Sequence, residues 1–330
     1  MYFPAVFRSC SRLVGVLTLI FVLLFCPGGR AEEISGNLVI FHAGSLAAPF
    51  QVIYQMYKTK YPKVNILNEA AGSLNSVRKI TELGRNCDVL AVADYTIIEQ
   101  LLMPRYTAWA VGFAGNEMAI MYRPDSKYAR EINARNWPQI LLRKDVEYGH
   151  SDPDADPCGY RTMMLWQLAE HFYQLPKLYN KLQEKCPPKN VRPKETDLIA
   201  LLETGELDYI FIYRSVCEQQ KALHMLLPEQ INLKSNRREE YYQHARVVIN
   251  GATPGSTMEK KGTAIAYGVT IPKNSANPKA AQAFVKLLLS SEGRNSLAKS
   301  GQPPFSPPLV IGDKSKLPQE IFQGDVPVTR

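Results

Sequence analysis

The sequence lacks the short motifs that mark many enzymes. It has no Gly-x-Ser-x-Gly turn, no His-Glu-x-x-His pair and no Gly-x-x-x-x-Gly-Lys-Ser/Thr phosphate loop. It also has no Cys-x-x-Cys pair and no Cys/His cluster with the spacing of a structural zinc site. None of the five histidines lies beside an obvious nucleophile in the sequence. These absences predict a protein that is not an enzyme and that carries no cofactor.

Long hydrophobic runs are scarce, and the longest lies near the N-terminus. Residues 13–25 are almost wholly apolar; they follow Arg8 and Arg12 and precede the small residues Gly29 and Ala31. This order is typical of a secretory signal peptide, and the run is short for a membrane span. We expect residues 1–31 to be a signal peptide cleaved after Ala31, with an uncleaved anchor as the alternative. The mature chain would then lie in the periplasm or on the outer face of the cytoplasmic membrane.

Cysteine is also sparse, with six residues in 330. Cys26 follows Phe25, whereas a lipid-anchored cysteine usually follows a small residue, so the pattern argues against a lipoprotein. Four cysteines remain after the expected cleavage, and an oxidising compartment permits disulfides among them. Four cysteines allow three pairings, and the sequence does not choose between them. They are Cys87, Cys158, Cys186 and Cys217.

No strong excess of one charge is present. The formal net charge is +8, and removal of the three arginines in residues 1–31 reduces it to +5. Basic residues are interleaved with acidic ones, as in residues 237–240 (RREE). A weak positive field of this kind favours anions, but no nucleic-acid-binding motif accompanies it. We therefore expect no nucleic-acid partner.

Short apolar runs alternate with amphipathic segments through most of the mature chain. This alternation predicts α/β lobes of the doubly wound type, in which strands lie between covering helices. The predicted strands are residues 38–41, 64–66, 88–92 and 208–213. The predicted helices are residues 46–61, 74–83, 95–102, 160–173, 196–202, 278–289 and 291–300.

Two extended segments, residues 109–122 and 246–271, are long enough to pass between lobes. We therefore predict one lobe from residues 32–113 and 265–330, and a second lobe from residues 114–264. A ligand would bind between them, where strands end and helices begin. The proline-rich tail from Gln302 onward is expected to run over the surface.

Two similar junctions join strands to helices in the first lobe. Residues 42–45 (HAGS) and 70–73 (AAGS) each place a glycine and a serine where a helix begins. A serine at a helix start is often only a cap, and a glycine often only permits a tight turn. Together, Ser45 and Ser73 also offer hydroxyl and backbone N–H donors at the positive ends of two helix dipoles, which suits an oxyanion.

The second lobe has comparable junctions. Residues 152–161 and 193–197 precede two predicted helices and contain several acids, which are common helix caps. Tyr213 ends a predicted strand, where its phenol can face a cleft between the lobes or simply pack.

At these junctions the chain resembles a known family, the archaeal-type tungstate/molybdate substrate-binding proteins of ABC importers (the WtpA branch). The resemblance runs from about residue 36 to about residue 308. It is carried by residues 42–46 (HAGSL), 71–73 (AGS), 156–161 (DPCGYR), 192–195 (RPKE), 205–209 (GELDY) and 212–215 (IYRS). The blocks at 156–161 and 212–215 are specific, whereas the Gly-Ser pairs are shared with molybdate binders more widely.

The resemblance implies a type II periplasmic-binding fold with tungstate or molybdate held between the lobes. Ser45 and Ser73 would donate hydroxyl and N–H hydrogen bonds, Cys158 its backbone N–H, and Tyr213 its phenol. Asp156 and Glu195 match two carboxylates that the resemblance implies as ligands of the metal centre. No Lys or Arg belongs to this set. The implied partners are a membrane permease with its cytoplasmic ATPase, and we expect a monomer.

Two acids beside a dianion require an explanation, because a carboxylate at 4 Å repels a unit negative charge by ~4 kcal/mol at an effective dielectric near 20. Hexavalent tungsten or molybdenum can expand its coordination and accept carboxylate oxygens, whereas the sulfur of sulfate cannot readily do so. Asp156 and Glu195 would therefore select against sulfate.

Three alternatives remain open from the sequence. The ligand could be sulfate or phosphate, and Asp156 could then accept the proton of phosphate. The chain could be a sensor that signals to a membrane kinase instead of a permease. It could also be a secreted enzyme that uses Asp156 and Glu195 as an acid-base pair, as in glycoside hydrolysis.

Overall fold

The computed structural model describes residues 1–2, 33–251, 253 and 255–323. The predicted cleavage site at Ala31 and the thiol of Cys26 lie outside these ranges, so the signal-peptide prediction is not tested. The compact unit begins at Ser35. Within the described ranges, no helix combines the length and apolar character that crossing a bilayer requires.

The first sheet contains, among the described residues, six strands in the order β13-β4-β12-β3-β1-β2. β1 runs parallel to β2 and β3, and β12 and β13 add antiparallel pairs on the β4 side. The apolar run at residues 38–41 forms the centre of β1, as a strand covered on both faces requires. The strands are β1 (Gly36–Ala43), β2 (Val64–Ala71), β3 (Val89–Val92), β4 (Trp109–Gly115), β12 (Ala266–Thr270) and β13 (Pro304–Gly312).

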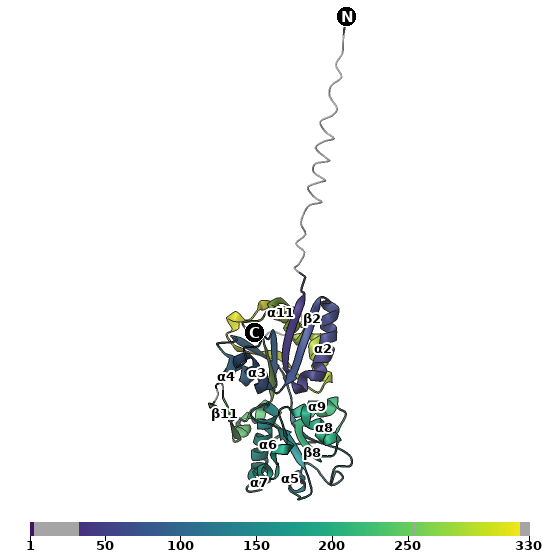
Figure 1. The fold of residues 1–330 in the computed structure, drawn as a ribbon, viewed down its shortest axis with the longest axis vertical. Helices are drawn as coiled ribbons and strands as arrows, with labels where there is room; N and C mark the ends of the chain where they lie inside the picture. Colours follow the sequence, from purple (N-terminus) through teal and green to yellow (C-terminus); the bar gives the residue numbers. More distant parts are fainter. Residues whose placement is uncertain (3–32, 252, 254, 324–330) are drawn as a thin grey trace. The chain divides into compact units, whose positions relative to one another are not determined.

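Two groups of helices cover this sheet (Figure 1). α3 (Ser73–Thr81) and α4 (Tyr95–Leu102) pack together, and both contact strands of the sheet. α2 (Ala47–Lys60), α11 (Pro278–Leu289) and α12 (Ser291–Lys299) form the other group. Side chains of Asp94, Asn277 and Ser290 cap α4, α11 and α12, satisfying backbone N–H groups at their starts.

The second sheet has the order β7-β6-β8-β5-β9 in the described part of the chain. Its strands are β5 (Met118–Tyr122), β6 (Tyr148–Ser151), β7 (Val191–Arg192), β8 (Tyr209–Tyr213) and β9 (Leu223–Leu226). The surrounding helices are α5 (Trp137–Leu141), α6 (Pro157–Tyr173), α7 (Leu178–Lys185), α8 (Leu198–Glu203) and α9 (Arg214–Gln219). A buried aromatic cluster of Trp137, Tyr148, Trp166 and Phe211 forms the core between them.

The chain crosses from the first sheet to the second between Gly115 and Met118, within the first predicted crossing segment. It returns through residues 262–265 into β12. The remainder of the second predicted crossing, residues 246–261, forms a separate hairpin of β10 (Arg246–Asn250) and β11 (Thr257–Lys261). The expectation of a single extended return segment was therefore only partly right, because much of it pairs with itself.

The tail after Gln302 was expected to run over the surface, and most side chains of residues 304–312 are exposed or half-buried, but a strand there was not predicted. Residues 304–312 form β13, which pairs antiparallel with β4, with an irregular register between Pro304 and Leu309. Prolines are compatible with an edge strand, because only one side of that strand must donate hydrogen bonds. The proline content therefore indicated an edge position and not the absence of a strand.

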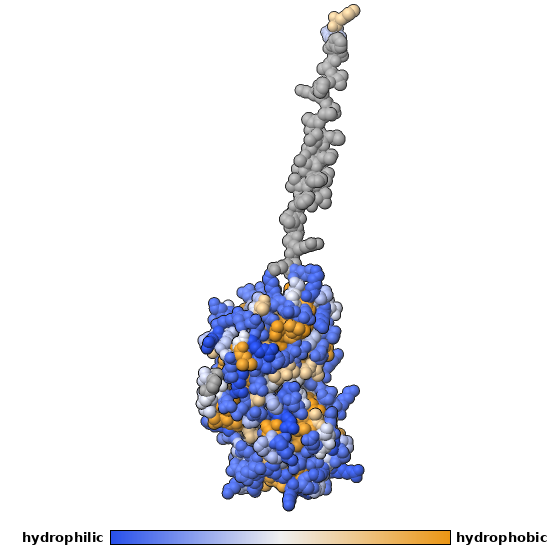
Figure 2. Space-filling view, viewed as in Figure 1, coloured by the Kyte–Doolittle hydropathy of each residue, from blue (hydrophilic) through white to orange (hydrophobic). Residues whose placement is uncertain are grey.

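Short helical turns complete the chain. They are η1 (Gly44–Leu46), η2 (Pro188–Asn190), η3 (Glu195–Asp197), η4 (Asn236–Arg238), α10 (Glu239–Tyr242), η5 (Lys314–Lys316) and η6 (Gln319–Phe322). The four cysteines of the described residues are free thiols. On the face seen in Figure 2, hydrophilic side chains predominate over the compact unit and separate its apolar patches.

Candidate functional site

The two Gly-Ser junctions of the first sheet lie side by side. β1 and β2 are parallel neighbours, and their last residues, Ala43 and Ala71, are register partners. η1 therefore begins beside the start of α3, and the buried side chains of Ser45 and Ser73 come from the same edge of the sheet. The Ser73 hydroxyl accepts a hydrogen bond from the backbone N–H of Ala93 at 3.0 Å.

The second sheet supplies a matching edge. β6 runs parallel to both β7 and β8, so the ends of these strands lie at one edge of the sheet. α6, η3 and α9 begin shortly after these strand ends. Asp156 caps α6: its Oδ1 accepts from the Cys158 N–H at 3.3 Å, and its Oδ2 accepts from the Glu195 N–H at 2.9 Å. One carboxylate thus ties the starts of α6 and η3 together.

The two edges are in direct contact. The Leu74 and Asn75 N–H groups at the start of α3 donate to the Ala155 carbonyl at 3.1 and 3.3 Å. A Cβ built on Gly44 would lie 3.0 Å from the Glu195 Oε2 atom. The six residues predicted to form the site are all buried, with at most 1% of each exposed. They are Ser45, Ser73, Asp156, Cys158, Glu195 and Tyr213.

Glu195 is the least compensated of these groups. Neither of its carboxylate oxygens meets a hydrogen-bond donor in good geometry among the described residues. Burial raises its pKa well above the usual value, the charge of Asp156 raises it further, and the nearby Ser45 hydroxyl opposes the rise. Burial also raises the pKa of Asp156, against the effect of its hydrogen bonds. A buried carboxylate without hydrogen-bond donors is costly, and the raised pKa values of the two groups reflect this cost.

The expectation that no Lys or Arg contacts the anion stays a prediction, but Arg161 lies directly behind the predicted donor Tyr213. Nη1 of Arg161 donates to the Tyr213 hydroxyl and to the Ala93 carbonyl, both at 2.8 Å. The guanidinium is buried and lies 3.8 Å from Asp94, which also pairs with Lys260 at 3.2 Å. The two cations outnumber Asp94, so a positive group lies one hydrogen bond behind the predicted anion donor Tyr213.

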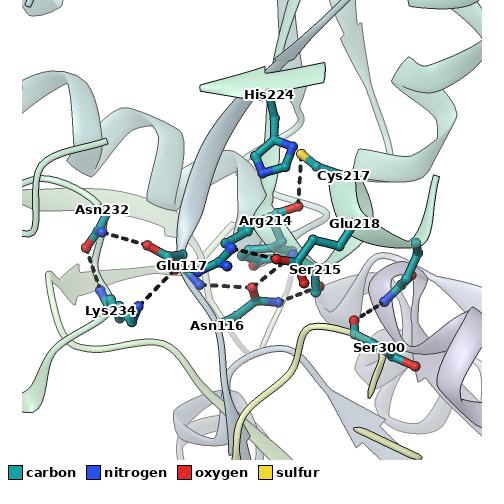
Figure 3. Close-up of polar contacts among 12 residues, drawn as sticks. Asn116, Glu117, Arg214, Ser215, Cys217, Glu218, His224, Asn232, Lys234 and Ser300 are labelled. Atoms are coloured by element: carbon teal, nitrogen blue, oxygen red, sulfur yellow. Dashed lines mark hydrogen bonds and ion pairs between the residues drawn. The ribbon is translucent and has the colours of Figure 1, made fainter. Parts of the chain in front are cut away.

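The side-chain partners of Ser45 carry no signal in the sequence. The Ser45 Oγ and the Tyr267 hydroxyl are 2.8 Å apart, and Asn116 donates to the same Tyr267 hydroxyl at 2.9 Å. Tyr267 lies in β12 and Asn116 lies in the first crossing, far from Ser45 in sequence. Figure 3 shows Asn116 beside Ser215 and Glu117 at this crossing. The junction motif predicts Ser45, but no local pattern identifies residues that contact it from elsewhere in the chain.

The chain is similar over most of its length to exported solute-binding proteins. The model of the bacterial extracellular solute-binding protein family matches residues 38–302. A protein of Petrotoga mobilis named as an uncharacterized solute-binding protein is 52% identical over 92% of this chain and 94% of its own length. The molybdate/tungstate-binding protein WtpA of Pyrococcus abyssi is 40% identical over 93% of this chain and 96% of its own.

A solved structure has the same fold at low sequence identity. The periplasmic molybdate-binding protein of Azotobacter vinelandii superposes with a TM-score of 0.56 at 15% identity, over 80% of this chain and 98% of that one. Together with the two mixed sheets and the two crossings, this likeness confirms the expected α/β architecture of a type II periplasmic-binding fold.

Proposed function

This chain belongs to the bacterial extracellular solute-binding protein family, and we propose that it captures tungstate or molybdate between its two lobes for an ABC importer. One observation carries the proposal: backbone donors at the start of α3, and Gly44 at the start of η1, lie against the buried residues of the second lobe in a single closed contact. The name of the relative from Pyrococcus abyssi supports the same ligand class.

Four groups would donate to the oxygens of the anion. Ser45 and Ser73 stand at the starts of η1 and α3, where backbone N–H groups and the helix dipole favour negative charge. Tyr213 accepts from Arg161, so the phenol hydrogen remains available for a ligand. The Cys158 N–H points to Asp156 at 3.3 Å, a long hydrogen bond that an anion oxygen would share or replace.

Asp156 and Glu195 would meet the metal centre and not the oxygens. Glu195 has the stronger support, because its two carboxylate oxygens are buried and lack donors in the described residues. Asp156 already accepts two backbone N–H groups, which orients its carboxylate and leaves its remaining lone pairs for a ligand. Tungsten or molybdenum can accept such oxygens, whereas sulfate would be repelled.

The same contacts weigh against the enzyme alternative. An acid-base pair needs two carboxyl groups free to exchange protons with a substrate. Asp156 instead joins two helix starts through both of its oxygens, and the named relatives are solute-binding proteins. A structural cap with a ligand contact fits these observations better than a proton-transfer group.

The family supports a location outside the cytoplasm, and the proposed location and partners are more specific than the family name. We propose export through a signal peptide cleaved after Ala31, a location in the periplasm or on the outer face of the cytoplasmic membrane, and action as a monomer. We propose that a permease and a cytoplasmic ATPase receive the anion. The two predicted lobes, residues 32–113 with 265–330 and residues 114–264, would open and close around it.

Thermal unfolding and calorimetry with four anions test the function. Tungstate and molybdate should stabilise the mature chain by ~4 kcal/mol at a thousandfold excess over the dissociation constant, because they bind only the folded state. Sulfate and phosphate should have little effect at the same concentration. Equal stabilisation by sulfate would overturn the ligand assignment, and a response to none of the four anions would overturn the proposed function.

A further inference from the structure

The side-chain amide of Asn116 has a fixed orientation. Its Oδ1 accepts from two backbone N–H groups, those of Glu117 at 2.9 Å and Ser215 at 3.4 Å. The reversed amide would turn its own hydrogens toward these donors, so Nδ2 must be the atom on the other side. Figure 3 shows this arrangement, with Asn116 between the crossing residue Glu117 and Ser215 in α9.

The fixed amide determines the direction of the next hydrogen bond. Nδ2 of Asn116 donates to the Ser215 Oγ at 2.8 Å and to the Tyr267 hydroxyl at 2.9 Å. Burial raises the pKa of Tyr267, so the phenol keeps its hydrogen at neutral pH. Asn116 Nδ2 cannot accept that hydrogen, and among the described residues the remaining partner of the phenol is the Ser45 Oγ at 2.8 Å.

Ser45 is therefore an acceptor toward Tyr267. The opposite direction would give the Tyr267 oxygen two donors and leave its own buried hydrogen without an acceptor, which is costly. Once Ser45 accepts from Tyr267, its own hydrogen must point elsewhere. Glu195 lies near the Ser45 hydroxyl, which opposes the rise that burial causes in the pKa of this carboxyl group. Glu195 also lies beside Gly44, on the side where the first and second lobes meet.

We propose that Asn116 and Tyr267 are positioning residues that fix the Ser45 hydroxyl as a hydrogen-bond donor to the bound oxyanion. The inference rests on the proposed function, because it assigns a direction to a hydroxyl that the proposed function brings to the ligand. Asn116 lies between β4 and β5, Ser215 is the second residue of α9, and Tyr267 lies in β12. The donor direction at Ser45 thus depends on contacts made by both lobes and the crossing between them.

A double-mutant cycle on tungstate affinity tests this role. Tyr267→Phe should weaken tungstate binding about tenfold in the natural background, because Ser45 then loses the donor that orients it. In a Ser45→Ala background the same change should alter affinity less than about twofold, because nothing remains to be oriented. Affinity is measured by titration calorimetry with tungstate, by displacement where binding is tight.

Tyr57→Phe is the matched control. It also removes a buried phenol hydroxyl, which donates to the Ala280 carbonyl at 2.9 Å. This hydrogen bond joins α2 to α11 and does not involve Ser45. It should lower the unfolding temperature and leave tungstate affinity unchanged. If Tyr267→Phe does not fold, Asn116→Ala replaces it in the same cycle. Asn116→Ala should weaken tungstate binding about threefold in the natural background and should have no effect in the Ser45→Ala background.

The outcomes separate the two levels of the proposal. If Tyr267→Phe weakens tungstate binding only when Ser45 is present, the result supports the positioning role. Losses from Ser45→Ala and Tyr267→Phe that multiply, or an unchanged affinity in Tyr267→Phe, overturn the positioning role while the proposed function stands. Failure of the natural chain to bind either tungstate or molybdate overturns the proposed function and this inference with it.

Discussion

Gly72 of the first lobe lies so close to Ala155 of the second that a Cβ built on Gly72 would be 2.4 Å from the Ala155 carbonyl oxygen. The same Cβ would lie 2.7 Å from the Pro193 carbonyl oxygen. Both neighbours are backbone atoms, which cannot rotate away as a flexible side chain can. The contact joins one Gly-Ser junction, residues 70–73, to both acidic junctions of the second lobe. The absence of a side chain at Gly72 is therefore a requirement of the closed arrangement.

The first prediction follows from this contact. Gly72→Ala should leave each lobe folded but prevent full closure, and overpacking of this severity costs about 1–3 kcal/mol, or roughly ten- to a hundredfold in tungstate affinity. Titration calorimetry measures the loss. Gly115→Ala is the control, because its Cβ would meet no atom closer than 3.4 Å. Unchanged affinity in Gly72→Ala would show that the ligand binds without this contact.

The second prediction concerns the cost and use of Glu195. Glu195→Gln keeps the size of the side chain and removes a buried carboxyl group whose oxygens lack hydrogen-bond donors in the described residues. The ligand-free protein should become more stable by about 1–3 kcal/mol, while tungstate affinity and its margin over sulfate both fall. Chemical denaturation and competitive titration measure the two effects.

Glu292→Gln serves as the exposed counterpart to Glu195→Gln. Glu292 is about half exposed and pairs with Lys60 at 2.6 Å, so its replacement should change neither stability nor anion preference measurably. A Glu195→Gln protein with the natural margin of tungstate over sulfate would rule out the selective role of this carboxylate.

Much of the fold was predictable because its elements follow local rules. The apolar run at residues 38–41 predicted β1, and the periodic apolar residues of 278–289 predicted α11. The strand in the tail was not predicted, because proline content does not distinguish an edge strand such as β13 from an irregular segment. Here the pairing partner, β4, decides the outcome, and it lies far away in sequence.

The candidate site was predictable only for residues that stand in local motifs. Ser45 and Ser73 stand in short junction motifs that a reader of the sequence can find. Their partners are different: Ser45 meets Tyr267 across 222 positions, and Arg161 meets Tyr213 across 52. Such contacts are created by the packing of the two sheets and leave no periodic or motif signal. Long-range side-chain hydrogen bonds are therefore the part of the site that only a structure supplies.

The third prediction isolates the phenol of Tyr213. Tyr213→Phe should weaken tungstate binding about tenfold, since one donor to the anion is lost and Arg161 loses an acceptor. Tyr148→Phe is a matched control in the same sheet, because its buried phenol donates to the Leu182 carbonyl at 2.7 Å. The control should lose stability without losing affinity. Equal affinities for the two variants would exclude Tyr213 from the ligand contacts.

The fourth prediction concerns pH and two buried histidines, His42 and His150. Burial lowers the pKa of both below the usual 6.5, and each ring contacts a backbone carbonyl through Nδ1. Between the lowered pKa and 6.5 the unfolded chain binds more protons than the folded one, so stability falls as pH falls below about 6.5. Each histidine contributes at most about 1.4 kcal/mol per pH unit.

Chemical denaturation of the ligand-free protein from pH 7 to 5 tests this assignment. The free energy of unfolding should decline less steeply with falling pH in a His42→Gln/His150→Gln variant. The raised pKa values of Asp156 and Glu195 act in the opposite direction, but both proteins share them, so parallel pH curves would contradict the assignment to the histidines.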